Sequence, residues 1–199
     1  MKEYIIRKKT SWEQVPFLEI NEKLRPFQAD IKAYGQLMYD AEKLYVRLTA
    51  EEKEIRKEQT GKFDMPCKDS CLEFFFSPLP GERKYFNIEM NPNGSMFLGI
   101  GTGIEDLVRL SPMNQERYGF HPQTEISDTG WVLTYEIPLC FIRLFFPDFT
   151  MRSGGRMRGN LYKCGDECAV RHWLAWNPAD AGVPHAFHNP DCFGTFLFE

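Results

Sequence analysis

The chain has 199 residues, of which 43% are hydrophobic and 15% aromatic, and 24 basic against 28 acidic side chains give a formal net charge of −4. A chain of this size and apolar content can bury a sizeable core, so disorder is not expected. The acidic balance argues against nucleic acid as a partner, because phosphate recognition needs a dense basic surface. No uncharged apolar stretch reaches the roughly 18 residues of a transmembrane helix, so no membrane span is predicted.

The first nine residues predict where the protein resides. Tyr4, Ile5 and Ile6 are flanked by charged side chains, so the segment lacks the apolar stretch of a secretory signal peptide. The expected location is the cytoplasm, or the extracellular space if a leader was removed. The six cysteines are expected to be reduced thiols, because disulfide frameworks are typical of much shorter secreted chains.

Apolar and polar residues alternate along most of the chain, as in Leu44, Val46 and Leu48, which is the pattern of half-buried strands. Asn93-Gly94 can form a tight turn and predicts an antiparallel hairpin around it. The predicted strands cover residues 34–39, 44–49, 70–76, 85–91, 95–100, 131–137, 156–164, 171–176 and 193–198. Short helices are expected in 104–110 and 138–146. The sequence therefore predicts an all-β fold, an antiparallel β-sandwich of about eight to ten strands with one or two short helices, as one domain over residues 1–199.

Enzyme signatures are absent from the sequence: it has no nucleophile elbow, phosphate-binding loop or zinc-protease motif. Glu73 and Glu89 alternate on two strands that could be neighbours, so they could form the carboxylate pair of a glycosidase. Exposed strand glutamates are the favoured interpretation, and no catalytic residue is assigned.

Four of the cysteines have the spacing of possible metal ligands. Cys67 and Cys71, and Cys164 and Cys168, have spacings that zinc sites allow, with His172 four residues further on. Side chains four residues apart on a strand are about 13 Å apart, however, which is too far for two ligands of one ion. Buried free thiols are therefore favoured.

The C-terminal third combines aromatic and planar polar side chains. Alternation places Arg158, Asn160 and Tyr162 on one face of a strand, and His172 and Trp176 on one face of the next, with Trp173 and Asn177 on its other face. An aromatic ring can stack on the C–H face of a pyranose while planar polar groups bind its hydroxyls. These strands are thus candidates for a saccharide site, although tryptophans in a sandwich are mostly core residues.

Several segments, in order, resemble the family 9 carbohydrate-binding modules, which are part of a wider DOMON-like group of β-sandwiches. They are Trp12–Pro16, Ala33–Thr49, Asp69–Phe75, Tyr85–Gly94, Gly130–Pro138, Arg158–Asp166, His172–Pro178 and His188–Gly194.

The resemblance implies a non-catalytic module that binds gluco- or xylo-oligosaccharides, in the best-known members at chain ends between two tryptophans. Such modules are typically attached to xylanases and other glycoside hydrolases of polysaccharide catabolism, so here a separate glycoside hydrolase would be the partner. Trp176 and Asn177 are carried over as the main ligand contacts, followed by Glu73, Glu89, Arg158, Asn160 and His172. Tyr85 or Phe63 could provide the second stacking wall. Some members hold structural calcium, for which Asp69, Asp128 and Asp166 at turns or strand ends are the candidate ligands.

Two alternatives stay open at this point. A haem- or metal-binding DOMON-like module would use His172 or His188 with Met90 or Met96 as axial ligands. An enzyme acting on glycosides would use Glu73 and Glu89 as acid and base.

Overall fold

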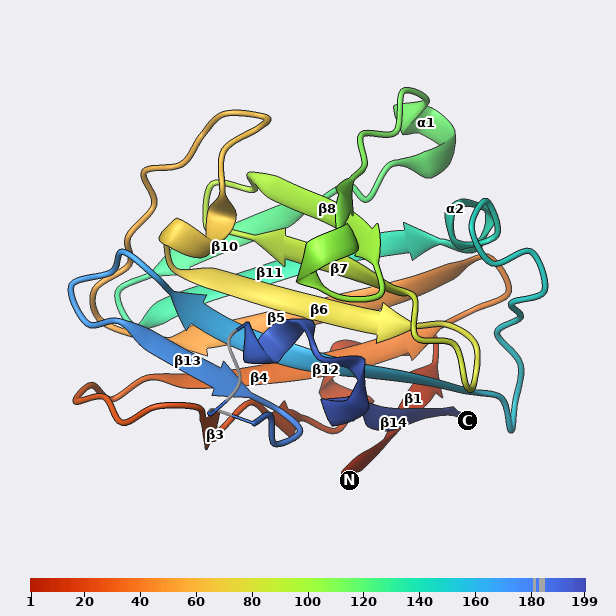
Figure 1. Cartoon of the computed structure of the whole chain (residues 1–199), viewed down its shortest axis with the longest axis horizontal. Coiled ribbons are helices and arrows are strands. Elements are labelled where there is room, and N and C mark those ends of the chain that lie inside the picture. Colours follow the sequence, from red (N-terminus) through yellow and green to blue (C-terminus); the bar gives the residue numbers. More distant parts are fainter. Residues whose placement is uncertain (181, 183–184) are drawn as a thin grey trace.

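A computed structural model describes residues 1–180, 182 and 185–199. It is mostly strand, with two short α-helices, α1 (Gln115–Tyr118) and α2 (Leu139–Ile142), and several 3-10 turns (Figure 1). The strands are β1 (Glu3–Lys8), β2 (Leu18–Glu19), β3 (Glu22–Lys23), β4 (Lys32–Tyr39), β5 (Lys43–Glu51), β6 (Cys71–Ser77), β7 (Tyr85–Met90), β8 (Met96–Gly101), β9 (Val108–Arg109), β10 (Gln123–Ser127), β11 (Gly130–Pro138), β12 (Arg156–Gly165), β13 (His172–Ala175) and β14 (Gly194–Phe198). The 3-10 turns are Trp12–Gln14, Pro66–Lys68, Ile104–Asp106, Ala186–His188 and Pro190–Cys192. Within the described residues, no helix has the length and apolar character needed to cross a bilayer.

The strands form two layers. Sheet A contains β9, β8, β7, β6, β12 and β14 in that order, and β13 pairs with the second half of β12 and with β3. Sheet B contains β10, β11, β5 and β4, with β2 on the far edge of β4. The predicted hairpin is confirmed: β7 and β8 pair antiparallel around Asn93-Gly94, and Gly94 has a φ of +75° that suits the turn.

Strand β1 joins the two layers, and it corrects the predicted fold class. Residues Glu3 to Ile6 pair parallel with β14 in sheet A, whereas Arg7 and Lys8 pair parallel with β4 in sheet B. The fold is therefore mixed, not purely antiparallel. The described residues also contain fourteen strands, more than the predicted eight to ten, because strands of two residues such as β2, β3 and β9 are too short to show alternation.

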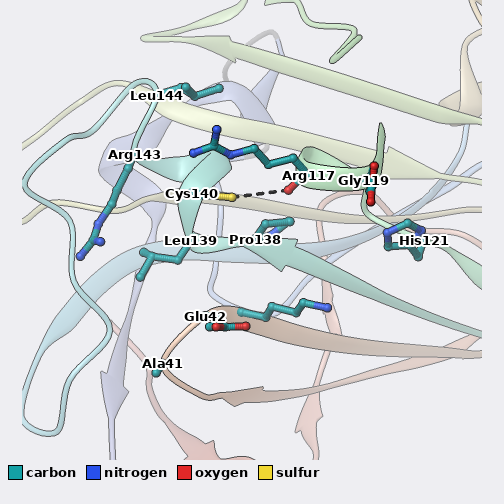
Figure 2. A pocket seen from close by; sticks show the side chains of 12 residues that line it. Ala41, Glu42, Arg117, Gly119, His121, Pro138, Leu139, Cys140, Arg143 and Leu144 are labelled. Atoms are coloured by element: carbon teal, nitrogen blue, oxygen red, sulfur yellow. Dashed lines mark hydrogen bonds between the residues drawn. The ribbon is translucent and has the colours of Figure 1, made fainter. Parts of the chain in front are cut away.

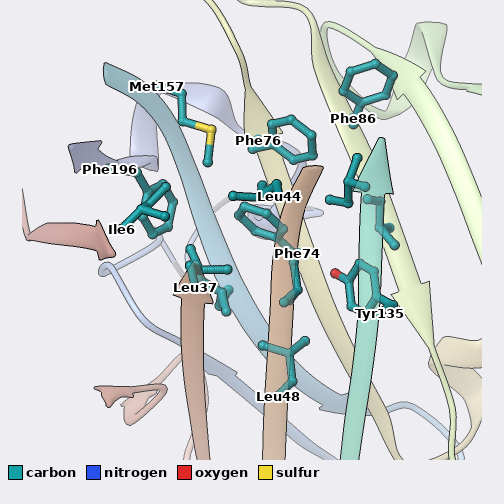
Figure 3. Close-up of a cluster of buried hydrophobic side chains, with 14 of the residues drawn as sticks. Ile6, Leu37, Leu44, Leu48, Phe74, Phe76, Phe86, Tyr135, Met157 and Phe196 are labelled. Carbon is teal, nitrogen blue, oxygen red and sulfur yellow. The ribbon is translucent and has the colours of Figure 1, made fainter. Parts of the chain in front are cut away.

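The main hydrophobic core lies between the sheets (Figure 3). Sheet B contributes the inward side chains of β4, β5 and β11, such as Leu37, Leu48 and Tyr135, and sheet A contributes those of β6, β7 and β12, such as Phe74 and Phe86. Helix α2 closes one end, where Phe141 packs on Phe86 with ring centroids 5.4 Å apart. This core follows directly from the period-two pattern of the sequence.

All nine predicted strands are present within a few residues, but the helices are less accurate. Residues 138–146 contain the single turn of α2, preceded by Pro138. Residues 104–110 form a 3-10 turn followed by β9 instead of a helix. Short segments of this kind are decided by tertiary pairing, here of β9 with β8, and not by local propensity.

Candidate functional site

The outer face of sheet A, which points away from the main core, carries many of the predicted residues. Strands β6, β7 and β12 present side chains there at every second position: Cys71, Glu73, Phe75, Tyr85, Asn87, Glu89, Arg158, Asn160, Tyr162 and Cys164. Phe187 and Phe193 cover this face, and Cys67 and Trp173 pack at its rim. Most of these side chains are therefore buried, and the ring of Tyr162 stacks directly on that of Phe187 with centroids 3.9 Å apart.

Glu73 and Glu89 do become neighbours, as the sequence suggested. They are directly opposite each other on β6 and β7. Both are buried, at 2% and 5% exposure. The Cys164 thiol donates to Glu73 Oε1 at 2.8 Å, and Asn87 Nδ2 donates to Glu89 Oε1 at 3.0 Å. Burial and the like charge of Glu89 raise the pKa of Glu73 well above its usual value, and burial raises the pKa of Glu89 to about 7.

The raised pKa of Glu89 predicts a pH-dependent contribution to stability. The pKa of Glu89 is ordinarily 4.5, its value in the unfolded chain, and about 7 in the folded chain. Between these two pH values the folded chain retains a proton that the unfolded chain loses, so the free energy of unfolding falls as the pH rises. This contribution is fully present below pH 4.5 and is lost on passing pH 7, with a size on the order of a few kcal/mol. We expect Glu89→Gln, measured by urea unfolding, to gain stability relative to the unmodified chain as the pH rises from 5 to 8.

A matched control for this experiment is Glu125→Gln, since Glu125 is an exposed glutamate on β10. The free energy of unfolding of this variant should change with pH as that of the unmodified chain does over the same range. If the free energy of unfolding of Glu89→Gln also followed that of the unmodified chain, this would contradict a raised pKa at Glu89.

Asn160 and Asn177 bind the protein's own backbone. Asn160 Oδ1 accepts from Asn177 N at 2.8 Å, and Asn160 Nδ2 donates to Asn177 O at 2.9 Å. Asn177 Nδ2 donates to Cys192 O at 2.9 Å and its Oδ1 accepts from Lys2 N at 2.6 Å. Arg158 donates to Phe193 O at 2.9 Å. These three side chains fasten the segment around Cys192 to β12.

Trp176 and His172 share a strand face, as the alternation predicts, but this face points into the core. Trp176 is 4% exposed and its ring stacks on Phe196, with centroids 4.7 Å apart. Its ring thus presents no surface for a ligand in this structure. His172 is buried, with Nε2 2.6 Å from Lys163 Nζ, and burial and that ammonium lower the pKa of His172 to about 4.

The three aspartates proposed for calcium are in separate environments. Asp69 is fully buried and accepts from Arg56, Gln59 N and Asn91 Nδ2, so donors already occupy its oxygens. Asp166 accepts from Trp173 Nε1 at 2.8 Å. Asp128 is exposed at the turn between β10 and β11. Among the described residues, the group with convergent ligand atoms is instead Cys71, Glu73 and Cys164.

The histidines considered as haem ligands also have protein partners. His188 Nδ1 lies 2.9 Å from Tyr85 OH, and burial lowers the pKa of His188 to about 4. His172 is held by Lys163, as described above. Met90 lies in the main core.

An open groove of about 420 Å³ lies at the edge of sheet A, next to the turn between β7 and β8. Phe63 lines it and is 70% exposed, whereas Tyr85, the other residue considered as a second stacking wall, is fully buried. The other lining side chains are apolar in Met96, Leu110 and Pro112, and polar in Thr60, Lys62, Asn93, Ser95, Arg109, Ser111 and Gln115.

Arg109 fixes the loop that carries Phe63. Its guanidinium donates to the carbonyls of Lys62, Phe63 and Asp64 at 2.8–3.1 Å. The same guanidinium contacts the rings of Phe97 and Phe63, with 4.8 and 5.5 Å to the centroids. An exposed aromatic ring is therefore held in place by a cation–π contact and three hydrogen bonds.

A second cavity, of about 680 Å³, lies beside α1 and α2 (Figure 2). Its walls are mainly charged and aliphatic, with Lys43, Arg117 and Arg143 beside Glu42 and Glu116. Cys140 is on α2, and its thiol donates to Arg117 O on α1 at 3.4 Å. Neither Glu73 nor Glu89 lines this cavity or the groove at Phe63.

Phe63 was a candidate from the sequence, whereas Arg109 and the polar lining of the groove were not. Those residues come from irregular loops and from a two-residue strand, for which period-two reasoning has no signal. A usable signal was the aromatic residue itself, because Phe63 stands between Lys62 and Asp64 in a polar segment where no core face explains it.

The sequence profile of carbohydrate-binding family 9 matches residues 3–198. A crystal structure of a candidate carbohydrate-binding protein from Bacteroides uniformis superimposes with a TM-score of 0.83 at 24% identity, covering 100% of this chain and 99% of that one. Two structures of a family 9 module from Caldicellulosiruptor kristjanssonii, in complex with cellotriose and with glucose, have TM-scores of 0.67 and 0.66 at 14% and 15% identity. They cover 100% of this chain and 94% and 96% of theirs. No curated protein matches the chain.

Proposed function

Because the chain belongs to carbohydrate-binding family 9, we propose that it binds a gluco- or xylo-oligosaccharide without acting on it, in the groove beside Phe63. The cellotriose and glucose complexes of the C. kristjanssonii module support a glucose-containing ligand. The alternative of a glycoside-active enzyme needs Glu73 and Glu89 to reach a substrate bond, and both carboxylates are buried.

The observation that carries this proposal is the exposed ring of Phe63 beside a polar groove. A pyranose has one face of C–H groups, which an aromatic ring can cover, and a rim of hydroxyls that need polar partners. Arg109 holds the Phe63 loop before any ligand arrives, so little conformational entropy is lost on binding. The volume of about 420 Å³ is in the range of small-molecule sites.

The predicted residues of the outer face then have a supporting role in the proposal. Asn160, Asn177 and Arg158 fasten the covering segment, and Trp176 fills the core beneath it. They fix the shape of sheet A without contacting the sugar.

The proposal extends to polysaccharide catabolism through a partner. A binding protein without a catalytic centre contributes to breakdown only if a separate glycoside hydrolase cleaves the saccharide that it holds.

We expect Phe63→Ala to weaken saccharide binding at least tenfold, about 1.4 kcal/mol, because the stacking surface is removed. Calorimetric titration of the full chain with glucose, cellotriose and xylotriose measures this directly.

The matched control is Phe17→Ala, which removes a ring of similar exposure, 62% against 70% for Phe63, next to β2 of sheet B. It should bind like the unmodified chain. Equal affinity of Phe63→Ala and the unmodified chain would place the site elsewhere, and no binding of any of these sugars by the folded chain would contradict the ligand class.

A further inference from the structure

The outer face of sheet A brings together thiols that are far apart in the sequence. Cys71 and Cys164 are paired in register across β6 and β12. Their sulfur atoms and a carboxylate oxygen of Glu73 all lie within 4.8 Å of one another, and all three residues are buried. The sequence spacing suggested two pairs, Cys67 with Cys71 and Cys164 with Cys168. The structure instead brings together Cys71 and Cys164.

More potential ligands surround this group. Cys67 packs against the same buried cluster, and its thiol interacts with the Glu89 carboxyl group. Glu89 Oε2 and Asn87 Oδ1 are buried acceptors without a hydrogen-bond partner in the described part of the chain. Within those residues, neither Glu73 nor Glu89 forms an ion pair with a basic side chain. The cluster therefore gathers thiols, carboxyl groups and unpartnered acceptors, and no basic side chain of the described residues pairs with either carboxyl group.

A buried unpartnered acceptor is costly, and two facing carboxylates cannot both ionise without a compensating charge. A cation bound between the strands would supply that charge. Two thiolates select a thiophilic metal over calcium or magnesium, and zinc sites accept cysteine together with carboxylate ligands.

We propose that the chain binds one zinc ion on the outer face of sheet A, through Cys71, Cys164 and Glu73. Cys67 and Glu89 are the neighbouring groups available for the fourth position. Binding replaces the protons of the two thiols and of the Glu73 carboxyl group, which pass to solvent, and no electrons are transferred. This proposal is independent of the groove at Phe63, which none of these residues lines.

The test uses the full chain, stripped of metal with a chelator, kept under a reductant and titrated with Co²⁺ as a spectroscopic substitute for Zn²⁺. We expect one equivalent to bind, with thiolate-to-cobalt charge-transfer absorption and the visible bands of tetrahedral coordination. One equivalent of zinc should then abolish the absorption. A folded chain that takes up no cobalt, or binds it without charge-transfer absorption, would overturn the proposal.

Variants then assign the ligands. Cys164→Ser and Cys71→Ser should lose most of the charge-transfer absorption, whereas Cys140→Ser, a partly exposed cysteine on α2, should retain it. The opposite pattern, or full absorption in both Cys164→Ser and Cys71→Ser, would overturn the assignment.

If a serine variant does not fold, Glu73→Gln provides a separate measurement, because the amide oxygen can still accept from Cys164. Both thiolates remain in this variant, so the charge-transfer band should persist at saturation while the cobalt affinity falls at least tenfold. An unchanged affinity would exclude Glu73 as a ligand and overturn the proposed site.

Discussion

Replacing Glu52 with alanine is expected to lower the free energy of unfolding by about 3–5 kcal/mol, because it leaves the ammonium of Lys163 buried without a counter-charge. Lys163 Nζ and Glu52 Oε2 are 3.2 Å apart, with side-chain exposures of 0% and 2%. Glu52 Oε1 also accepts from Trp131 Nε1 at 2.9 Å and from the Ser70 hydroxyl. The variant therefore loses an ion pair and leaves the Ser70 hydroxyl without its acceptor, whereas Trp131 Nε1 keeps a second partner, Ser70 Oγ at 2.9 Å. Urea unfolding followed by tryptophan fluorescence measures the change.

The neighbouring residue provides the control for this prediction. Glu51 is about half exposed and pairs with Lys32 at 3.7 Å on the surface, so Glu51→Ala should cost at most about 1 kcal/mol. The double variant Glu52→Leu with Lys163→Met should recover much of the loss, because apolar residues of similar size remove the unpaired charge. Similar costs for Glu52→Ala and Glu51→Ala would contradict a buried pair.

Phe74→Ala is expected to lower the free energy of unfolding by about 3–5 kcal/mol, because it removes a ring from the packed core. Phe74 is fully buried at the centre of the main core (Figure 3). Its ring stacks on Phe76 and meets Phe196 edge to face, with centroids 4.9 and 5.7 Å away. Removing it opens a cavity that two sheets held by hydrogen bonds cannot close. Thermal or urea unfolding of the purified chain measures the loss.

Phe63→Ala is the natural comparison, because it removes the same side chain from an exposed loop. Its stability should stay within about 0.5 kcal/mol of the unmodified chain. Equal losses for the two variants would contradict the burial of Phe74, and a large loss for Phe63→Ala would mean that its effect on saccharide binding cannot be attributed to stacking alone.

The strands that form the core were predictable because one face of each is buried, which imposes a period of two on the sequence. Residues 44–49 and 131–137 show this clearly, and they pair as β5 and β11 at the centre of sheet B. Strand β1 was missed because its alternation is limited to Tyr4 and Ile6 among charged neighbours. Its parallel pairing with β14 depends on a partner almost the whole chain away, which no local pattern can report.

For the site, the sequence showed which side chains share a strand face, but not which layer each face meets. Glu73 and Glu89 were correctly placed as possible neighbours, yet both are buried. The outer face of sheet A is covered in part by Phe187 and Phe193, which come from a distant segment of the chain. Trp176 illustrates the same limit: its ring was assigned to a polar face, and the structure places that face against Phe196. Burial is a property of the assembled layers and has no signature in a single strand.

The bridging position of β1 has a consequence for how the molecule is made. Its partner β14 keeps an open edge until β1 is in place, and β14 is synthesised almost a full chain length after β1. The entropic cost of bringing β1 and β14 together grows only slowly with the length of chain between them. Native states dominated by distant contacts nevertheless form slowly. During that delay the edge of β14 that awaits β1 is unpaired, and the β1 segment of a second molecule fits it as well as the chain's own. Strand exchange between nascent chains is therefore the misassembly to expect when the protein is produced at high concentration.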